Sequence, residues 1–201
     1  MRSERKPESV FFVGVTGGIC AGKSAFAERL RQELGLEYCR IICEDFYYRD
    51  HIVDFTDPSA IDFALLYQHL LQLQRGEPVR LPIYDFAARR RLFETMKMYP
   101  ADVILVEGAL FLTQSKITDL LTESVFLDTP EPIRLERRLM RETVLGGRTR
   151  DDVLGEFRER IKPVHNQCIE SAKSLATYCI YEDETAREAI ADLVDKLGID
   201  S

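Results

Sequence analysis

The most constraining feature of this sequence is a glycine-rich motif near its N-terminus. Gly17, Gly22, Lys23 and Ser24 complete the pattern G-x-x-x-x-G-K-[ST], and residues 11–15 before it form a short apolar run typical of a buried strand. In such a phosphate loop, glycines let backbone N–H groups converge on phosphate oxygens, while a lysine and a hydroxyl serve the phosphates and Mg²⁺. A helix predicted over 23–34 directs its positive N-terminal end at the same phosphates. A chance glycine-rich turn is the alternative, and the strand–loop–helix order disfavours it.

Length and composition restrict the remaining possibilities. The chain has 201 residues and a net charge of −7, so a duplex nucleic acid is not expected as its main partner. Residues 1–9 are charged and lack the apolar core of a secretory signal, and no run approaches the length of a membrane span. The five cysteines show no zinc-binding spacing, which is typical of a reduced interior. We therefore expect a cytoplasmic protein with no membrane partner, consisting of a flexible leader (1–9) and one domain (10–201).

Strand-like and helix-like runs alternate along the chain. Strands are predicted over 38–43, 103–106, 124–128 and 176–181. A helix is predicted over 59–74, with Ser59 as its N-cap, and another begins at 130 or 131. A third runs from 151 or 152 to 161 or 162, where Pro163 breaks it. The last two helices are predicted over 164–174 and 184–196. Two further strands, 79–84 and 92–98, predict an inserted β-hairpin over about 78–99. This order indicates a three-layer α/β fold with a mostly parallel sheet.

Two carboxylates follow predicted strands. Asp45 comes just after the strand over 38–43, and Glu107 directly follows the apolar strand over 103–106. Because ligands gather at the carboxyl ends of parallel strands, both are expected beside the phosphate loop. Asp45 is the candidate general base and Glu107, with Ser24, the candidate Mg²⁺ site. The alternatives are a surface turn for Asp45 and an ion pair with a neighbouring Lys or Arg for Glu107.

Arginines gather at two places. The hairpin carries a run over 89–91, which is either a solvated tip or a means of steering an anionic ligand. A second group lies at helical spacing in a segment, about 134–150, that ends at a Gly-Gly pair and predicts a lid over phosphates: Arg134, Arg137, Arg138 and Arg141. The alternative is a surface helix whose arginines are partly neutralised by Glu131, Glu136 and Glu142.

Six ordered motifs, over about residues 10–195, resemble the uridine kinase group of the phosphoribulokinase/uridine kinase family: GGICAGKS, EDFYYRD, DPSAID, LPIYDFAARRR, YPADVILVEGALFL and VFLDTPEPIRLERRLMRETVLGGR. The resemblance implies ATP- or GTP-dependent phosphorylation of a ribonucleoside 5′-hydroxyl with Mg²⁺, often in a homo-oligomer, a dimer or tetramer. The implied catalytic residues are Asp45, Lys23, Arg138 and Arg141. Nucleotide would be bound by Gly17, Gly18, Ala21, Gly22, Lys23, Ser24, Arg141 and Arg148. The acceptor would be bound by Asp45, Tyr48, Phe55, Asp57, Tyr84, Phe86, Arg89 and Arg138.

Three positions depart from the family pattern. The acid expected at the ribose hydroxyls is displaced by one residue, so that Thr56 precedes Asp57. Arg89 stands where the family usually has a histidine, and the lid lacks one arginine before Gly147. A nucleoside kinase is therefore the first hypothesis. A kinase for another hydroxylated metabolite, such as nicotinamide riboside, a sugar phosphate or a pantothenate-like compound, is the second, and a catalytically silent nucleotide-binding module is the third.

Overall fold

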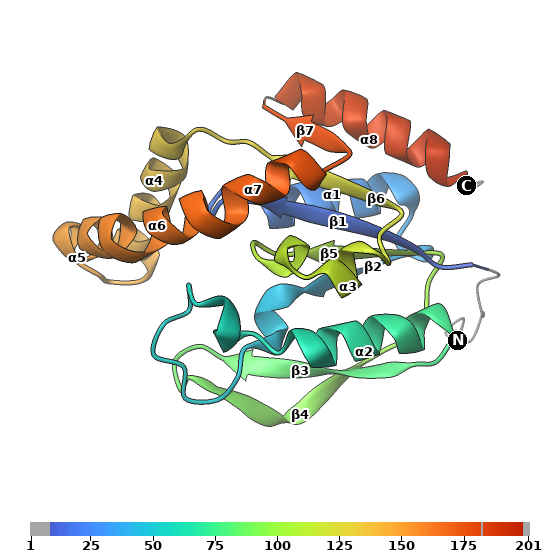
Figure 1. Ribbon diagram of the computed structural model, residues 1–201, viewed down its shortest axis with the longest axis horizontal. Helices are drawn as coiled ribbons and strands as arrows, with labels where there is room; N and C mark the ends of the chain where they lie inside the picture. Colours follow the sequence, from blue (N-terminus) through green and yellow to red (C-terminus); the bar gives the residue numbers. More distant parts are fainter. Residues whose placement is uncertain (1–8, 182, 199–201) are drawn as a thin grey trace.

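The computed structural model describes residues 9–181 and 183–198 and is built around a five-stranded sheet. The strand order is β2-β5-β1-β6-β7, and every neighbouring pair is parallel (Figure 1). The strands span Phe11–Gly17 (β1), Cys39–Cys43 (β2), Val103–Glu107 (β5), Glu123–Leu127 (β6) and Tyr178–Ile180 (β7). The predicted mostly parallel α/β sheet is confirmed. The predicted leader lies almost entirely outside the described residues.

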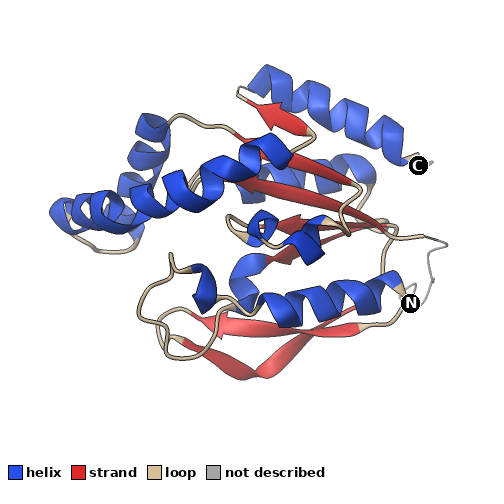
Figure 2. Cartoon of the chain, in the orientation of Figure 1, coloured by secondary structure: helices blue, strands red, loops and turns tan. Residues whose placement is uncertain are grey.

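Helices cover both faces of the sheet and give three layers (Figure 2). Alternate residues of β1 serve the two faces, as the two-residue period of a strand requires. Val13 and Val15 pack in one cluster with α1 (Lys23–Leu34) and α8 (Asp183–Leu197). Phe12 packs in the other cluster, with α2 (Phe63–Gln74) and residues beside α3 (Ser115–Thr118). The phosphate-loop motif, between β1 and α1, therefore lies at the edge where the parallel strands end.

The predicted hairpin is present but forms a sheet of its own. Strands β3 (Val79–Asp85) and β4 (Arg90–Met98) pair antiparallel, with an irregularity between Pro82 and Tyr84. Strand β4 begins two residues earlier than predicted, directly after a turn in which Arg89 has a left-handed backbone (φ 52°). Val79 and Leu81 pack with α2 side chains, so the hairpin is anchored on that helix (Figure 1).

The start of α2 differs from the prediction. Ser59 was the predicted N-cap, but the helix begins at Phe63, and the Asp62 side chain caps it by accepting the N–H of Leu65. Ser59 lies instead in a separate 3-10 turn, Pro58–Ala60, that Asp57 caps. The proline after Asp57 sets the backbone for this turn and delays the helix. Helix α3 has only four residues and was not predicted, because a single turn has little periodicity to detect.

The prediction that Pro163 breaks a helix is wrong. Helices α4 (Glu131–Met140), α5 (Arg150–Glu156), α6 (Lys162–Val164) and α7 (Glu170–Ala172) are extended or joined by wider π-helical turns. Such turns cover 141–145, 157–161 and 165–169, so two of them flank Pro163. A wider turn changes the hydrogen-bond spacing, so a residue with no N–H and a bulky ring can be accommodated without ending the helix.

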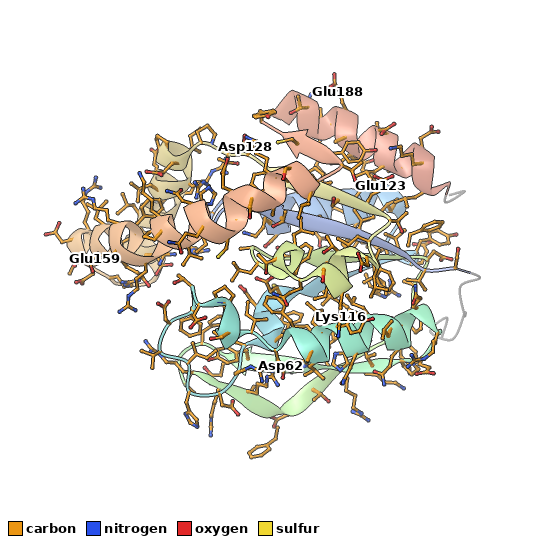
Figure 3. All side chains as sticks on the ribbon, in the orientation of Figure 1. Asp62, Lys116, Glu123, Asp128, Glu159 and Glu188 are labelled. Carbon is orange, nitrogen blue, oxygen red and sulfur yellow. The ribbon has the colours of Figure 1, made fainter. Side chains whose placement is uncertain are left out.

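Arg91 ties the hairpin to the segment that follows β2. Its Nε and Nη2 donate to the carbonyl oxygens of Tyr48 and Tyr47, each at 2.8 Å, and its Nη1 lies 3.5 Å from an Asp62 oxygen. Asp62 is labelled in Figure 3, at the start of α2. The three hairpin arginines therefore differ, since Arg91 is half-buried and structural while Arg90 is exposed.

We expect Arg91→Ala to lower the free energy of unfolding by about 2 kcal/mol, because two carbonyls and a carboxylate lose a charged donor. Urea denaturation measures this loss. The matched control is Arg90→Ala, which removes the adjacent exposed arginine and should change stability by less than about 0.5 kcal/mol. Equal effects of the two substitutions would contradict the structural assignment of Arg91.

Candidate active site

The phosphate loop wraps around its own lysine. Lys23 Nζ donates to the carbonyl oxygens of Gly17 and Gly18, at 3.3 and 3.1 Å. The loop needs left-handed backbone at Gly17 (φ 144°), Cys20 (φ 63°) and Gly22 (φ 102°). A Cβ at Gly17 would also lie 2.6 Å from the carbonyl oxygen of Leu127, so only glycine fits there. The sequence motif therefore folds into a ring of backbone groups with the lysine ammonium bound to it.

Helix α4 and the segment that leads into it also contact the phosphate loop. The loop's sequence motif does not predict this contact. Thr129 Oγ1 donates to the Ala21 carbonyl at 2.9 Å, and Arg137 Nη1 lies 3.3 Å from the same oxygen. Arg134 is buried and lies flush against Gly18, where any Cβ would be 2.5 Å from its Nη1. Arg134 and Arg137 thus support the loop, whereas the sequence analysis placed them only in a lid.

Ser24 and Glu107 lie together as predicted from their spacing to the strands. Ser24 Oγ is 3.0 Å from both carboxylate oxygens of Glu107. The reason is register: Val15 of β1 and Cys43 of β2 are both paired with Glu107 at the end of β5. A hydroxyl and a carboxylate, both oxygen donors, therefore face each other at the start of α1.

Asp45 lies two residues beyond β2, next to this pair, and its side chain opens to the cavity. Asp45 is an exposed residue, and its carboxyl group meets solvent within the cavity. Partial desolvation by the cavity walls raises the pKa of Asp45 above its ordinary value, Lys23 opposes the shift, and the Glu107 charge adds to it. A carboxylate with a raised pKa is better matched to accepting a proton near neutral pH.

Glu44 is a site residue that sequence reasoning missed. It is fully buried, and its carboxylate accepts the N–H groups of Ala109 (3.1 Å) and Leu110 (3.0 Å), directly after β5. Gly108 leaves the space for it, because a Cβ there would lie 2.4 Å from the Glu44 Cβ. Burial, and then the charge of Asp45, raise the pKa of Glu44 to about 7. The only sequence signal was a second acid beside Asp45 at a strand end.

Four aromatic side chains form a cluster at the far end of the site, which we call the aromatic wall: Tyr48, Phe55, Tyr84 and Phe86. Their ring centroids lie 5.0–6.1 Å apart, mostly edge to face. The side chain of Arg89 lies over the Phe55 ring, with Cζ 5.7 Å from its centroid. Tyr48, Phe55, Phe86 and Arg89 line the cavity, while Tyr84 supports them from behind.

Thr56, not Asp57, is the polar residue of this loop that faces the cavity. Thr56 is buried among the lining residues, and its hydroxyl donates to Asp54 Oδ1 at 2.7 Å. Asp57 is exposed and accepts the N–H of Ser59 at 2.8 Å. The structure therefore does not bring Asp57 to the other predicted acceptor-binding residues.

The lid arginines are paired with carboxylates. Arg138 Nη2 and Arg148 Nη1 both bind Glu156 Oε2, at 2.8 and 2.6 Å. Arg141 Nη2 binds Glu142 Oε1 at 3.1 Å, and Arg148 is also 3.6 Å from Glu142 Oε2. Of the acids weighed from sequence, Glu142 is a partner but Glu131 binds Lys162 instead, and Glu136 is exposed. Burial would raise the pKa of Glu156, but the hydrogen bond from Arg148 and the Arg138 charge outweigh it and lower that pKa.

One cavity of about 1760 Å³ joins these parts. It extends from the phosphate loop past Asp45 and Glu107 to the aromatic wall. Arg138, Arg141 and Arg148 of the predicted lid also line it, together with Glu156 just beyond that segment. Figure 3 labels Glu159 on the lid side and Asp62 on the side of α2 and the hairpin. Among the described residues, no helix has the length and apolarity that a bilayer-spanning segment requires.

Comparison with known proteins gives consistent matches over most of the chain. The sequence profile described as "Phosphoribulokinase / Uridine kinase family" matches residues 12–186. A uridine kinase from Escherichia fergusonii is 35% identical, over 92% of this chain and 93% of that protein. A uridine kinase from Shewanella frigidimarina is 38% identical, over 82% of this chain and 84% of that protein.

Solved structures show the same fold. A candidate fructose transport system kinase from Silicibacter superposes with a TM-score of 0.75 at 19% identity, over 89% of this chain and 93% of that chain. A possible uridine kinase from Bacillus stearothermophilus gives a TM-score of 0.63 at 18% identity, over 88% and 91% of the two chains. At such identities the likeness concerns the fold alone.

We expect the stability of the protein to depend on the proton of Glu44. Because the folded-state pKa, about 7, lies above the ordinary value of 4.5, folding favours the protonated form. The protonated form of Glu44 contributes on the order of 3 kcal/mol to the free energy of unfolding. This contribution is fully present below pH 4.5 and is lost as the pH rises through 7. Denaturant titrations between pH 4.5 and 8 should therefore show a steeper decline for the wild type than for Glu44→Gln, which cannot titrate. Parallel curves for the two proteins would refute the raised pKa.

Proposed function

The chain belongs to the phosphoribulokinase/uridine kinase family, and on this premise we propose that it transfers a phosphoryl group from ATP or GTP to the 5′-hydroxyl of uridine or cytidine. The observation that carries the proposal is one cavity that joins a phosphate loop, the carboxylates of Asp45 and Glu107, and an aromatic wall. These are the parts needed to hold a triphosphate, to activate a hydroxyl and to bind a planar base.

In this proposal, Asp45 acts as the general base. Asp45 accepts the proton of the acceptor hydroxyl as the oxygen attacks the terminal phosphorus, and the nucleoside diphosphate leaves from the opposite side. Its raised pKa supports this role, because Asp45 then binds a proton more tightly than an ordinary aspartate does. Glu44 positions Asp45 by fastening the end of β2 to the backbone after β5.

Phosphate binding is the task of the loop and its lysine. The loop is already closed around Lys23, whose bonds to the Gly17 and Gly18 carbonyls can be exchanged for phosphate oxygens. Ser24 and Glu107 fit Mg²⁺, because they offer a hydroxyl and a carboxylate oxygen within 3.0 Å of each other. Bound there, the ion would neutralise charge on the transferring phosphate.

The aromatic wall supports a base-bearing acceptor over a sugar phosphate. A planar heterocycle gains stacking and apolar burial against Phe55 and Phe86, whereas a sugar phosphate does not. Arg89 adds hydrogen-bond donors beside Phe55, and these suit the carbonyl oxygens of a pyrimidine. Relatives with the name uridine kinase also support this acceptor. The homo-oligomer and the cytoplasmic location stay predictions.

We expect Asp45→Asn to lower kcat by about 10²–10⁴-fold, because the acceptor hydroxyl loses its base. ADP release, coupled to a reporter reaction with uridine as acceptor, measures turnover. The Kd for ATP, measured by calorimetry, should change less than about two-fold. Asp119→Asn, an exposed carboxylate beyond α3, is the matched control and should leave both values unchanged. Unaltered turnover in Asp45→Asn would remove Asp45 from this role.

Acceptor identity is tested with a panel of uridine, cytidine, adenosine, nicotinamide riboside and phosphorylated sugars. We expect selective turnover of the two pyrimidine nucleosides. Arg89→Ala should raise KM for the nucleoside about ten-fold and leave KM for ATP unchanged, since Arg89 lies against Phe55 at the far end of the cavity. Arg90→Ala is again the control. Turnover confined to an anionic acceptor would show that the hairpin arginines serve a different substrate.

A further inference from the structure

The Glu156 carboxylate lies between two arginines of the lid, Arg138 and Arg148. A single oxygen, Glu156 Oε2, accepts from both Arg138 and Arg148, at 2.8 and 2.6 Å. Its other oxygen, Oε1, takes no hydrogen bond from any residue that the structure describes. All three side chains line the cavity that contains the phosphate loop. This arrangement places a negative charge between two arginines that line the cavity.

Arg138 needs an anion at this position. Only 8% of its side chain is exposed, and its Nε finds no partner among the residues of the described ranges. A guanidinium removed from water is costly unless an opposite charge lies beside it. Glu156 supplies that charge.

A phosphate is chemically interchangeable with a carboxylate here. Both present negatively charged oxygens that accept charge-assisted hydrogen bonds from guanidinium groups. Arg148 can change partners because it follows Gly147, whose left-handed backbone (φ 65°) has open space around it. A second carboxylate, Glu142, binds Arg141 through Oε1 at 3.1 Å, and its Oε2 lies 3.6 Å from Arg148.

We propose that Glu156 occupies the place of a phosphate group between Arg138 and Arg148, and that it thereby sets how weakly the enzyme holds nucleotide. An incoming triphosphate must displace the carboxylate before it gains these two arginines, and a departing diphosphate is replaced by it. Glu156 is thus an affinity-determining residue of the lid. The inference rests on the proposed nucleotide binding, not on the identity of the acceptor.

The test is calorimetric titration of the full chain with ATP in the absence of Mg²⁺, comparing the wild type with Glu156→Gln. The amide keeps one acceptor oxygen for the arginines but removes the negative charge. We expect the Kd for ATP to fall about ten-fold, the size expected when one like charge is removed near a phosphate in a partly screened cavity. A residue that only positioned the arginines would give the opposite sign, with weaker binding.

Three single variants and one double variant make the result specific. Glu136→Gln removes an exposed carboxylate from the same lid and should leave the Kd unchanged. Arg148→Gln should weaken ATP binding, and the gain from Glu156→Gln should shrink in that background, because the two residues act together. Glu142→Gln should tighten binding by a smaller factor, and it serves as the test variant if Glu156→Gln fails to fold.

The two proposals fail in different ways. If the wild type binds neither ATP nor GTP in the same titration, the proposed function is wrong. If the wild type binds ATP but Glu156→Gln binds it equally or more weakly, Glu156 is not a stand-in for phosphate and the present inference is overturned.

Discussion

The parallel pairing of β1 with β5 and β6 is the constraint on which the rest of the structure depends. Backbone hydrogen bonds in this register bring Gly17, Glu107 and Leu127 to one edge of the sheet. The position of that edge determines where α1 begins, and so where Lys23 and Ser24 lie. The loop between β1 and α1 is short, and Lys23 binds back to the Gly17 carbonyl. The chemistry of the site is therefore fixed by main-chain geometry before any side chain of the lid or hairpin is considered.

Charge is the second organising factor. The site gathers several cations and carboxylates within one cavity, and each group depends on the others for compensation. Near the sheet, Lys23 offsets the carboxylates of Asp45 and Glu44, while full burial of Glu44 and partial desolvation of Asp45 raise the pKa of each acid. In the lid, internal glutamates offset the arginines. In the proposed function, a ligand that carries phosphates would therefore have to exchange its oxygens for these carboxylates.

Sequence reasoning identified the parts whose signal is local. The phosphate loop, the central strands and the acids at their ends were all placed by motif and by apolar runs, and the structure brings Ser24, Asp45 and Glu107 into one cavity. It missed features that depend on contacts between distant segments. The Glu44 contact with Ala109 spans 65 residues, and the bonds from Arg91 to Tyr47 and Tyr48 depend on the hairpin folding back. Pro163 was misjudged because a π-helical turn has no signal in the spacing of apolar residues.

The hairpin and the loop before α2 carry the aromatic wall, and neither belongs to the main sheet. Arg91 anchors the hairpin mainly through carbonyl oxygens, which every residue type possesses. The side chains that we propose for acceptor binding can therefore be replaced while the Arg91 anchor and the edge that carries the phosphate loop stay intact. In the proposed function, acceptor choice and phosphoryl transfer thus rest on separate segments of one scaffold, and substitutions in two short segments would alter the acceptor without altering the transfer site.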